Sequence, residues 1–365
     1  MSPKKTRKIV YSAGRSVEEV ALRYGLKRVV KLASNENNWG LNARIINCFC
    51  RVLKDSYRYP DSSYADLRTS IGRRFGVNPG NVVTGNGSDE VLGILLDRLT
   101  PPSSETLIPA PSYQLYRILL NNFNRKYTEV PLKGWEYDLT AFLKKVGSRT
   151  GMVVLCNPNN PTGTYITSAM LESFLKKLPR RVWVIVDEAY ADFADAPDFG
   201  GGLPLVKKYP NLIVCRTFSK LFCLAGLRLG YAFVPEKAAE IYNYYRPPFS
   251  VNKLVEKAGF LFEEQDYFDG LARKVLKEKE RLYAELEKFG RYGVRVGRTQ
   301  TNFVFLHGLK DAKAVFEALL ARGVIVRELS GFGIRNGLRV TVGRPAENSL
   351  FLREFGSVLR SSGLK

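Results

Sequence analysis

Short apolar runs alternate with amphipathic helical patterns along the first two thirds of the chain. The runs are rich in β-branched residues and read as buried strands: 81–85, 105–110, 151–156, 182–187, 212–215 and 230–234. Near-continuous apolar strands of this kind are typical of a largely parallel sheet that is covered on both faces. The pattern therefore predicts an α/β fold.

From about Pro247 the pattern changes. A long charged helix is predicted over 267–289, followed by strands in VRVG, NFVFL, VIVRE and LRVTVG, a helix over 311–321 and a final helix. This order predicts a small α+β domain after the large one. We expect residues 1–45 to form an N-terminal arm that contributes to the small domain, 46–250 the large domain and 251–365 the small domain.

Length and composition fit two domains of a soluble globular protein, with 365 residues, 45% hydrophobic and 25% charged. No apolar run is long enough for a membrane helix, and no apolar stretch follows the basic start, so we expect a cytoplasmic protein. The five cysteines are odd in number and form no CxxC pair. We therefore expect reduced thiols and no metal site.

The net charge of +21, from 56 Lys and Arg against 35 Asp and Glu, raises the alternative of a nucleic-acid-binding protein. The basic residues are scattered over helix faces, however, and form no stripe interleaved with exposed aromatics. We expect no nucleic-acid partner. A basic surface also suits an enzyme whose ligands carry phosphate.

Candidate chemistry follows the predicted strands. Gly85 and Gly87 permit a sharp turn, and Ser88 and Asp89 then open a helix whose N–H groups could bind an anion, although these two residues are equally common as helix caps. Asp187 ends a buried strand and therefore needs a cationic partner.

Lys220 and Arg228 lie in RTFSKLFCLAGLRLGY, after another strand. A lysine in apolar surroundings has a lowered pKa and becomes a nucleophile and base. An aldehyde cofactor with a phosphate and a ring nitrogen would use Lys220, Asp187 and the 87–89 turn together, which indicates pyridoxal 5′-phosphate. Taken singly, Lys220 could be a surface lysine and Arg228 the partner of a nearby carboxylate.

Six motifs in this order make the chain resemble the fold-type-I pyridoxal-phosphate aminotransferases: GNGSDE, PAPSYQLY, CNPNNPTGT, VDEAYADF, RTFSKLFCLAGLRLGY and LRVTVG. Four further segments resemble the histidinol-phosphate aminotransferase family in particular: VYSAGRSVEEVALRYG, KLASNEN, YRYPD and RPPFSVN. The resemblance implies a large domain with a mostly parallel seven-stranded sheet, a small α+β domain, and a homodimer.

The same resemblance implies roles for the cofactor residues. Lys220 would form the Schiff base and then move the proton, while Asp187 would keep the ring nitrogen protonated. Asn160 and Tyr190 would hydrogen-bond the phenolic oxygen, and Tyr113 would stack on the ring. The remaining residues resemble a phosphate cradle: Ser88, Asp89, Thr217, Ser219 and Arg228, with Tyr59 of the other subunit.

The implied reaction converts L-histidinol phosphate and 2-oxoglutarate to imidazole acetol phosphate and glutamate, by a ping-pong mechanism in histidine biosynthesis. Arg339 resembles the arginine that receives the substrate anion, and a bidentate fork fits that task. Arg327, Tyr11 and Asn35 match positions that help to bind the substrate.

Two other activities stay open on the sequence. The chain resembles the threonine-phosphate decarboxylases in framework, and an aromatic or broad-specificity aminotransferase is the third reading. NNWGLN departs from the family pattern after KLASNEN, and Trp39 is expected near the substrate entrance.

Overall fold

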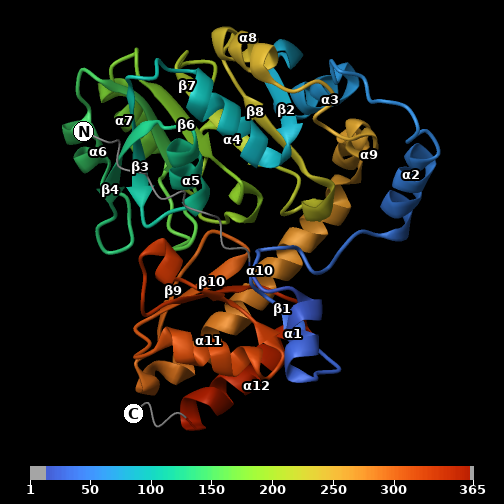
Figure 1. Cartoon of the computed structure of the whole chain (residues 1–365), viewed down its shortest axis with the longest axis vertical. Coiled ribbons are helices and arrows are strands. Elements are labelled where there is room, and N and C mark those ends of the chain that lie inside the picture. Colours follow the sequence, from blue (N-terminus) through green and yellow to red (C-terminus); the bar gives the residue numbers. More distant parts are fainter. Residues whose placement is uncertain (1–13, 362–365) are drawn as a thin grey trace, which may run out of the picture.

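The computed structural model describes residues 14–361, and its largest element is a seven-stranded sheet in the upper half of Figure 1. The strand order is β2-β8-β7-β6-β5-β3-β4. The strands are β2 (Val82–Asn86), β3 (Glu105–Ala110), β4 (Lys126–Pro131), β5 (Thr150–Cys156), β6 (Trp183–Asp187), β7 (Leu212–Thr217) and β8 (Leu229–Phe233). Within this sheet β8 runs opposite to the other six strands, and all pairs that do not include β8 are parallel. The predicted mostly parallel seven-stranded sheet is therefore confirmed.

Helices cover both faces of the large sheet, as its apolar strands require. One face packs against α4 (Gly87–Arg98), α5 (Gln114–Asn122) and α8 (Glu236–Tyr245). The other face packs against α3 (Ala65–Phe75), α6 (Leu139–Lys145), α7 (Ser168–Lys177) and part of α10 (Gln265–Glu287). Because the strands β3 to β7 run in parallel, their carboxyl ends all lie at the same end of the sheet.

A second sheet lies in the lower half of Figure 1, with strand order β12-β13-β10-β9 and antiparallel pairing. Its strands are β9 (Arg295–Gly297), β10 (Phe303–His307), β12 (Arg327–Glu328) and β13 (Leu338–Thr341). The helices α11 (Ala312–Leu320) and α12 (Pro345–Ser361) lie in the same half, and α10 runs between the two halves.

The segment before the large sheet packs against the lower half, where Val20 and Ala33 share an apolar cluster with Leu320 and Ile325. It contains α1 (Val17–Tyr24), β1 (Val30–Lys31) and α2 (Ala43–Leu53), and α9 (Lys253–Glu256) packs near α2. β1 pairs in parallel with β11 (Val324–Ile325). The domain boundaries at residues 45 and 250 stay a prediction, and this pairing is the contact that supports a shared N-terminal arm.

The structure differs from the predicted strands in two places. The edge strand β4 was not among the predicted apolar runs, because its positions are mostly exposed or half-buried. VIVRE is not one strand: β11 pairs with β1, whereas β12 pairs with β13 in the other sheet. Within residues 14–361, no helix is long and apolar enough to cross a membrane.

Candidate active site

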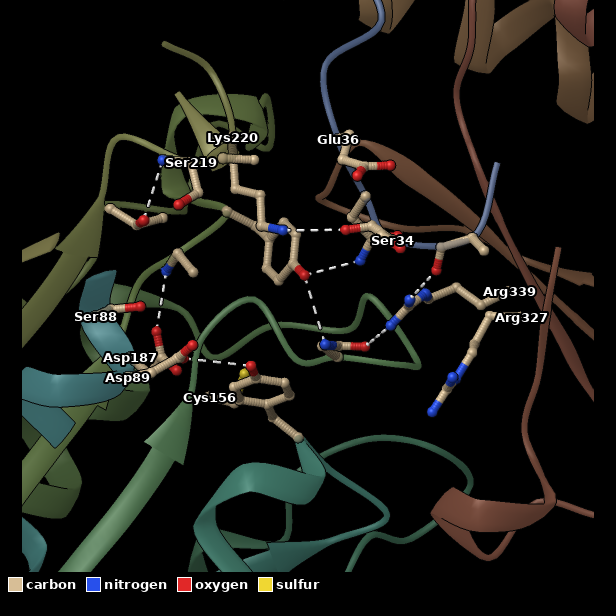
Figure 2. A pocket seen from close by; sticks show the side chains of 18 of the residues that line it. Ser34, Glu36, Ser88, Asp89, Cys156, Asp187, Ser219, Lys220, Arg327 and Arg339 are labelled. Atoms are coloured by element: carbon tan, nitrogen blue, oxygen red, sulfur yellow. Dashed lines mark hydrogen bonds between the residues drawn. The ribbon is translucent and has the colours of Figure 1, made fainter. Parts of the chain in front are cut away.

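A cavity of about 270 Å³ opens at the carboxyl ends of β5, β6 and β7 (Figure 2). Residues 33–36 and the strands β12 and β13 close it from the other side. Ligands of open α/β sheets bind at this edge. Of the predicted site residues within 14–361, all but Tyr59 line the cavity: Asn35, Ser88, Asp89, Tyr113, Asn160, Asp187, Tyr190, Thr217, Ser219, Lys220, Arg228, Arg327 and Arg339.

Lys220 follows β7 and points into the cavity, where its Nζ donates a hydrogen bond to the Ser34 carbonyl at 3.2 Å. Burial lowers the pKa of Lys220 to about 8, and the positive charge of Arg339 adds to this effect. A neutral amine is therefore accessible near neutral pH, as a nucleophile or base requires.

Asp187 is the last residue of β6 and only 2% of its surface is exposed. It accepts hydrogen bonds from the Tyr116 hydroxyl at 2.6 Å and the Ala189 N–H at 3.2 Å. Burial raises the pKa of Asp187 to about 6. Within residues 14–361 no Lys or Arg forms an ion pair with Asp187, so the cationic partner that the sequence predicts for it stays a prediction. A protonated ring nitrogen would supply this charge.

The β2–α4 turn forms a cradle for an anion. Asn86 is the N-cap of α4 and its side chain makes no capping bond, so Ser88 and Asp89 lie inside the first turn and are not caps. Arg228 Nη2 pairs with Asp89 Oδ2 at 3.0 Å. This arrangement places a guanidinium beside a helix N-terminus, where a phosphate is favoured.

Two glycines allow the close approach in this cradle. A Cβ on Gly87, whose φ is +76°, would lie 2.3 Å from Arg228 Nη2. A Cβ on Gly230 would lie 2.0 Å from the Ser88 nitrogen. The hydroxyl of Thr217, which also lines the cavity, accepts the Ser219 N–H at 3.1 Å. The residues present therefore fit a bound phosphate.

Tyr190 stands at the centre of a buried polar network. Its hydroxyl accepts from Asn35 Nδ2 at 2.8 Å and from Asn160 Nδ2 at 3.4 Å. Arg339 donates through Nη1 to Asn160 Oδ1 at 2.5 Å and through Nη2 to the Ala33 carbonyl at 2.6 Å. Burial raises the pKa of Tyr190 above its ordinary value, which keeps the hydroxyl protonated as a donor.

Tyr116 was not predicted from the sequence as a site residue. It is fully buried in α5 and packs edge-on against Tyr113, with ring centroids 5.6 Å apart. Tyr113 is the N-cap of α5 and has non-helical backbone angles, so helical spacing in PSYQLY could not have linked the two tyrosines. Phe332 also lines the cavity and was not predicted.

Two of the described predicted positions, Tyr59 and Trp39, do not line the cavity. Tyr59 is 79% exposed and stacks on Phe249, with ring centroids 4.7 Å apart. Tyr11 lies outside the described residues. Trp39 is not among the residues that line the cavity, because it packs against the main hydrophobic core.

Residues 27–354 match the family model of aminotransferase class I and II. The chain belongs to this family. Among its curated relatives, the histidinol-phosphate aminotransferase 2 of Carboxydothermus hydrogenoformans is 40% identical, covering 96% of each chain. The histidinol-phosphate aminotransferase of Anaeromyxobacter sp. is 38% identical, again over 96% of each.

The fold is similar to that of a solved histidinol-phosphate aminotransferase. The Sinorhizobium meliloti enzyme, crystallised in complex with pyridoxal 5′-phosphate, has a TM-score of 0.87, with 24% identity and 96% coverage of both chains. This confirms the predicted fold type.

Proposed function

We propose that this aminotransferase uses pyridoxal 5′-phosphate to convert L-histidinol phosphate and 2-oxoglutarate to imidazole acetol phosphate and glutamate. The names of the curated relatives support the substrate assignment. One structural observation supports the proposal most directly: Lys220, Asp187, Arg327 and Arg339 line a single cavity. These are the groups that an aldehyde cofactor and an anionic substrate each require.

The chain's residues divide the work of holding the cofactor. Pyridoxal phosphate, when bound, supplies an aldehyde that takes up the amino group and a protonated ring that withdraws electrons. Asp187 stabilises the ring charge, because an opposite charge at close range favours the protonated form. Arg228 and the first turn of α4 would hold the phosphate, Tyr113 would pack on the ring, and the Tyr190–Asn160 pair would hold the phenolic oxygen.

Lys220 is the base. Its amine would hold the cofactor aldehyde and, when free, would move a proton to and from the donor carbon that carries nitrogen. Because the pKa of Lys220 is lowered to about 8, both its neutral amine and its ammonium form are populated near neutral pH.

Arg327 and Arg339 select the substrate. Histidinol phosphate presents a dianion, whereas 2-oxoglutarate presents carboxylates at the same site. Two guanidiniums suit the higher charge, and a planar fork binds either group through paired N–H donors. Asn35, held by Tyr190 and Thr341, lies beside them, and we assign Tyr11 to the same substrate group.

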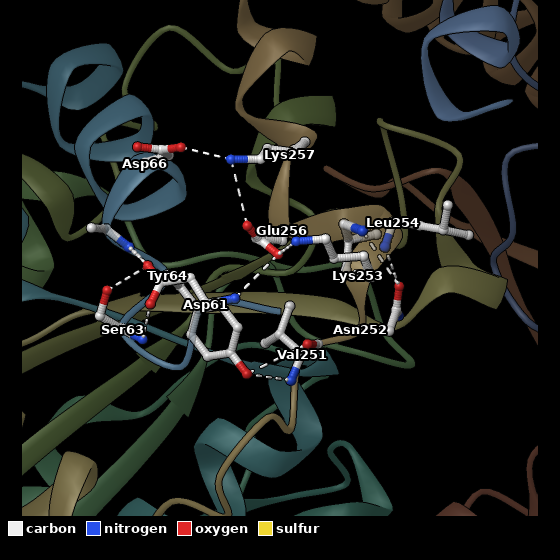
Figure 3. A network of polar contacts seen from close by, with 12 residues as sticks. Asp61, Ser63, Tyr64, Asp66, Val251, Asn252, Lys253, Leu254, Glu256 and Lys257 are labelled. Carbon is white, nitrogen blue, oxygen red and sulfur yellow. Dashed lines mark hydrogen bonds and ion pairs between the residues drawn. The ribbon is translucent and has the colours of Figure 1, made fainter. Parts of the chain in front are cut away.

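The active protein is a homodimer in which Tyr59 reaches the cofactor phosphate of the second subunit. Figure 3 shows the network that supports this: Tyr64 exchanges hydrogen bonds with Val251, and Glu256 accepts from the Asp61 N–H at 3.3 Å. These contacts fix the segments that carry Tyr59 and Phe249, so an exposed aromatic pair is held ready for a partner. A cytoplasmic location stays a prediction.

The test is a spectrum of the purified holoenzyme during addition of L-histidinol phosphate and then 2-oxoglutarate. The cofactor absorption should convert to its amino form with the first and return with the second. Conversion by aromatic amino acids alone would leave the cofactor assignment intact and overturn the substrate. Release of carbon dioxide from threonine phosphate would instead favour a decarboxylase.

A further inference from the structure

A second polar pocket lies at the opposite edge of the large sheet from the active site. Its volume is about 410 Å³, and its lining includes Thr150 at the start of β5 and Trp183 at the start of β6. β6 carries Asp187 at its other end. At the rise of an extended strand, the two ends of β6 are about 13 Å apart. The pocket is therefore separate from the site described above.

The charges around this pocket are of one sign. Arg149, Arg181 and Lys237 line it, and none of its described lining residues is Asp or Glu. Among the residues the structure describes, neither Arg149 nor Lys237 has an ion-pair partner. Arg181 is held by backbone carbonyls only, with Nη1 donating to Thr150 at 2.6 Å and Nη2 to Gly147 at 2.7 Å. Three cations thus share a pocket without a counter-ion.

Hydroxyl groups complete the set of donors. Ser103, Ser104 and Ser148 line the same pocket, and within residues 14–361 their hydroxyls form no hydrogen bond to another residue. Gly151 in β5 allows the segment that carries Thr100 and Ser104 to pack closely against this strand. A Cβ on Gly151 would lie 2.9 Å from Ser104 Cβ and 3.0 Å from Thr100 Cγ2. The hydroxyls are consequently available to a ligand.

A buried guanidinium stands directly behind the wall. Arg125 is only 7% exposed, and its Nη2 donates to the carbonyl and hydroxyl of Thr100, at 2.7 and 2.5 Å, and to the Pro101 carbonyl at 3.0 Å. Its Nε is buried without a hydrogen-bond partner, and no carboxylate forms an ion pair with it in the described chain. The nearby Asp97 is paired with Arg98 at 2.8 Å.

The negative charge of Asp97 offsets part of the cost of burying Arg125, but Asp97 is shared with Arg98, so the surroundings of Arg125 still favour an anion in the adjacent pocket. We propose that this pocket binds the phosphate group of a small molecule. Cations and hydroxyls that converge from several loops match the tetrahedral acceptor set of a phosphate better than the planar edge of a carboxylate. The ligand is either inorganic phosphate or a phosphate monoester, and the titrations below distinguish the two.

Trp183 in the pocket wall provides the measurement. The chain has three tryptophans, so a holoenzyme with Trp39→Phe and Trp135→Phe reports from Trp183 alone. We expect a saturable fluorescence change with inorganic phosphate at constant ionic strength, and none with chloride. The same titration with AMP shows whether a monoester binds more tightly than the free ion.

Arg149→Ser with Lys237→Gln, in the same background, should weaken phosphate binding at least about tenfold, since each charge-assisted contact contributes strongly. Lys274→Gln with Lys313→Gln removes the same charge from exposed positions on α10 and α11 and should leave binding unchanged. Transamination should be unchanged in both variants, which shows that they are folded. An unsaturable response, or equal loss in both pairs, would overturn the proposal.

Discussion

At the scale of single residues, Asp187 should lower the stability of the protein when no cofactor is bound. Its folded pKa is raised from 3.8 to about 6 by burial, so the folded state binds this proton more tightly than the unfolded state. Stability is therefore retained below pH 4 and lost as the pH rises to 6, by about 3 kcal/mol. Asp187→Asn should make the apoprotein more stable by up to this amount at pH 8.

Urea unfolding of both apoproteins at pH 4 and pH 8 measures the effect. The gain should appear only at pH 8, and the variant should lose transamination because the ring nitrogen has no carboxylate. Exposed Asp55→Asn is the control and should change neither quantity. A variant less stable than the parent at pH 8 would show that the Tyr116 hydrogen bond outweighs the burial of charge.

Phe332 should set the spacing of the two substrate arginines. Its ring lies 5.7 Å from the Arg327 guanidinium and 5.9 Å from that of Arg339, and it is 8% exposed. Phe332→Leu keeps an apolar wall but removes the ring face. The two cation–π contacts contribute about 0.5–2 kcal/mol each, so their combined loss, about 1–4 kcal/mol, should raise the KM for histidinol phosphate by at least roughly 5-fold.

Phe305→Leu is the matched control, because Phe305 belongs to the same apolar cluster and does not line the cavity. Steady-state kinetics with both substrates distinguish the roles. If Phe305→Leu raises the KM for histidinol phosphate as much as Phe332→Leu does, Phe332 acts through packing and does not space the arginines.

The residues that the sequence could predict are those whose chemistry is unusual for their surroundings. A lysine among apolar residues and an acid at the end of a buried strand need an explanation, so Lys220 and Asp187 stood out. Tyr116 did not, since a tyrosine in an amphipathic helix is ordinary. Its importance arises from a contact with Asp187, 71 positions away, which only the folded chain creates.

At the scale of elements, the cradle depends on the contact between β8 and the start of α4. A Cβ on Gly230 would meet the Ser88 nitrogen at 2.0 Å and the Gly87 carbonyl carbon at 2.3 Å. These are backbone atoms, so they cannot swing aside as a side chain would. Gly230→Ala should therefore displace the first turn of α4, at a cost of about 1–3 kcal/mol or more.

Cofactor titration of the apoprotein tests this contact. Gly230→Ala should weaken pyridoxal phosphate binding at least about tenfold, because the displaced N–H groups no longer face the phosphate. Gly226→Ala is the control, since a Cβ there meets nothing within 4 Å. Unchanged cofactor affinity in folded Gly230→Ala would show that the phosphate does not use this turn.

Elements were predicted where burial made their pattern strong. The central strands are apolar on both faces, so their positions were clear from the sequence. β4 pairs on one side only and carries Lys126, Thr128 and Glu129, a composition that does not look like a strand. The division of VIVRE depends on two partners in different sheets: β1, which lies far away along the chain, and β13, which follows after a short turn.

At the scale of the whole molecule, part of the net charge of +21 is gathered in two clusters of Lys and Arg side chains. One is at the active-site cavity, which Lys220, Arg228, Arg327 and Arg339 line. The other is the unpaired cluster at the opposite edge of the sheet. Both place cations at sheet edges, where loops from distant segments meet, and the sequence could predict only the first because no motif marks the second.

The shared active site is the prediction that belongs to the assembled molecule. Lys220→Ala should be inactive, and Tyr59→Ala should be poorly active at limiting cofactor because the phosphate loses one contact. In a hybrid dimer, one site combines Lys220 from one subunit with Tyr59 from the other. Random reassociation makes half of the dimers hybrid with one intact site each, so about a quarter of the parental activity should return.

Lys220→Ala mixed with Arg339→Ala is the control for this complementation. Lys220 and Arg339 line the cavity of the same chain, so no hybrid of these two variants contains an intact site and activity should stay low. Activity is measured after unfolding and refolding the mixed subunits together. If the Tyr59→Ala mixture also stays at the sum of its parts, each chain forms its site alone, and the stacked pair of Tyr59 and Phe249 must have another use.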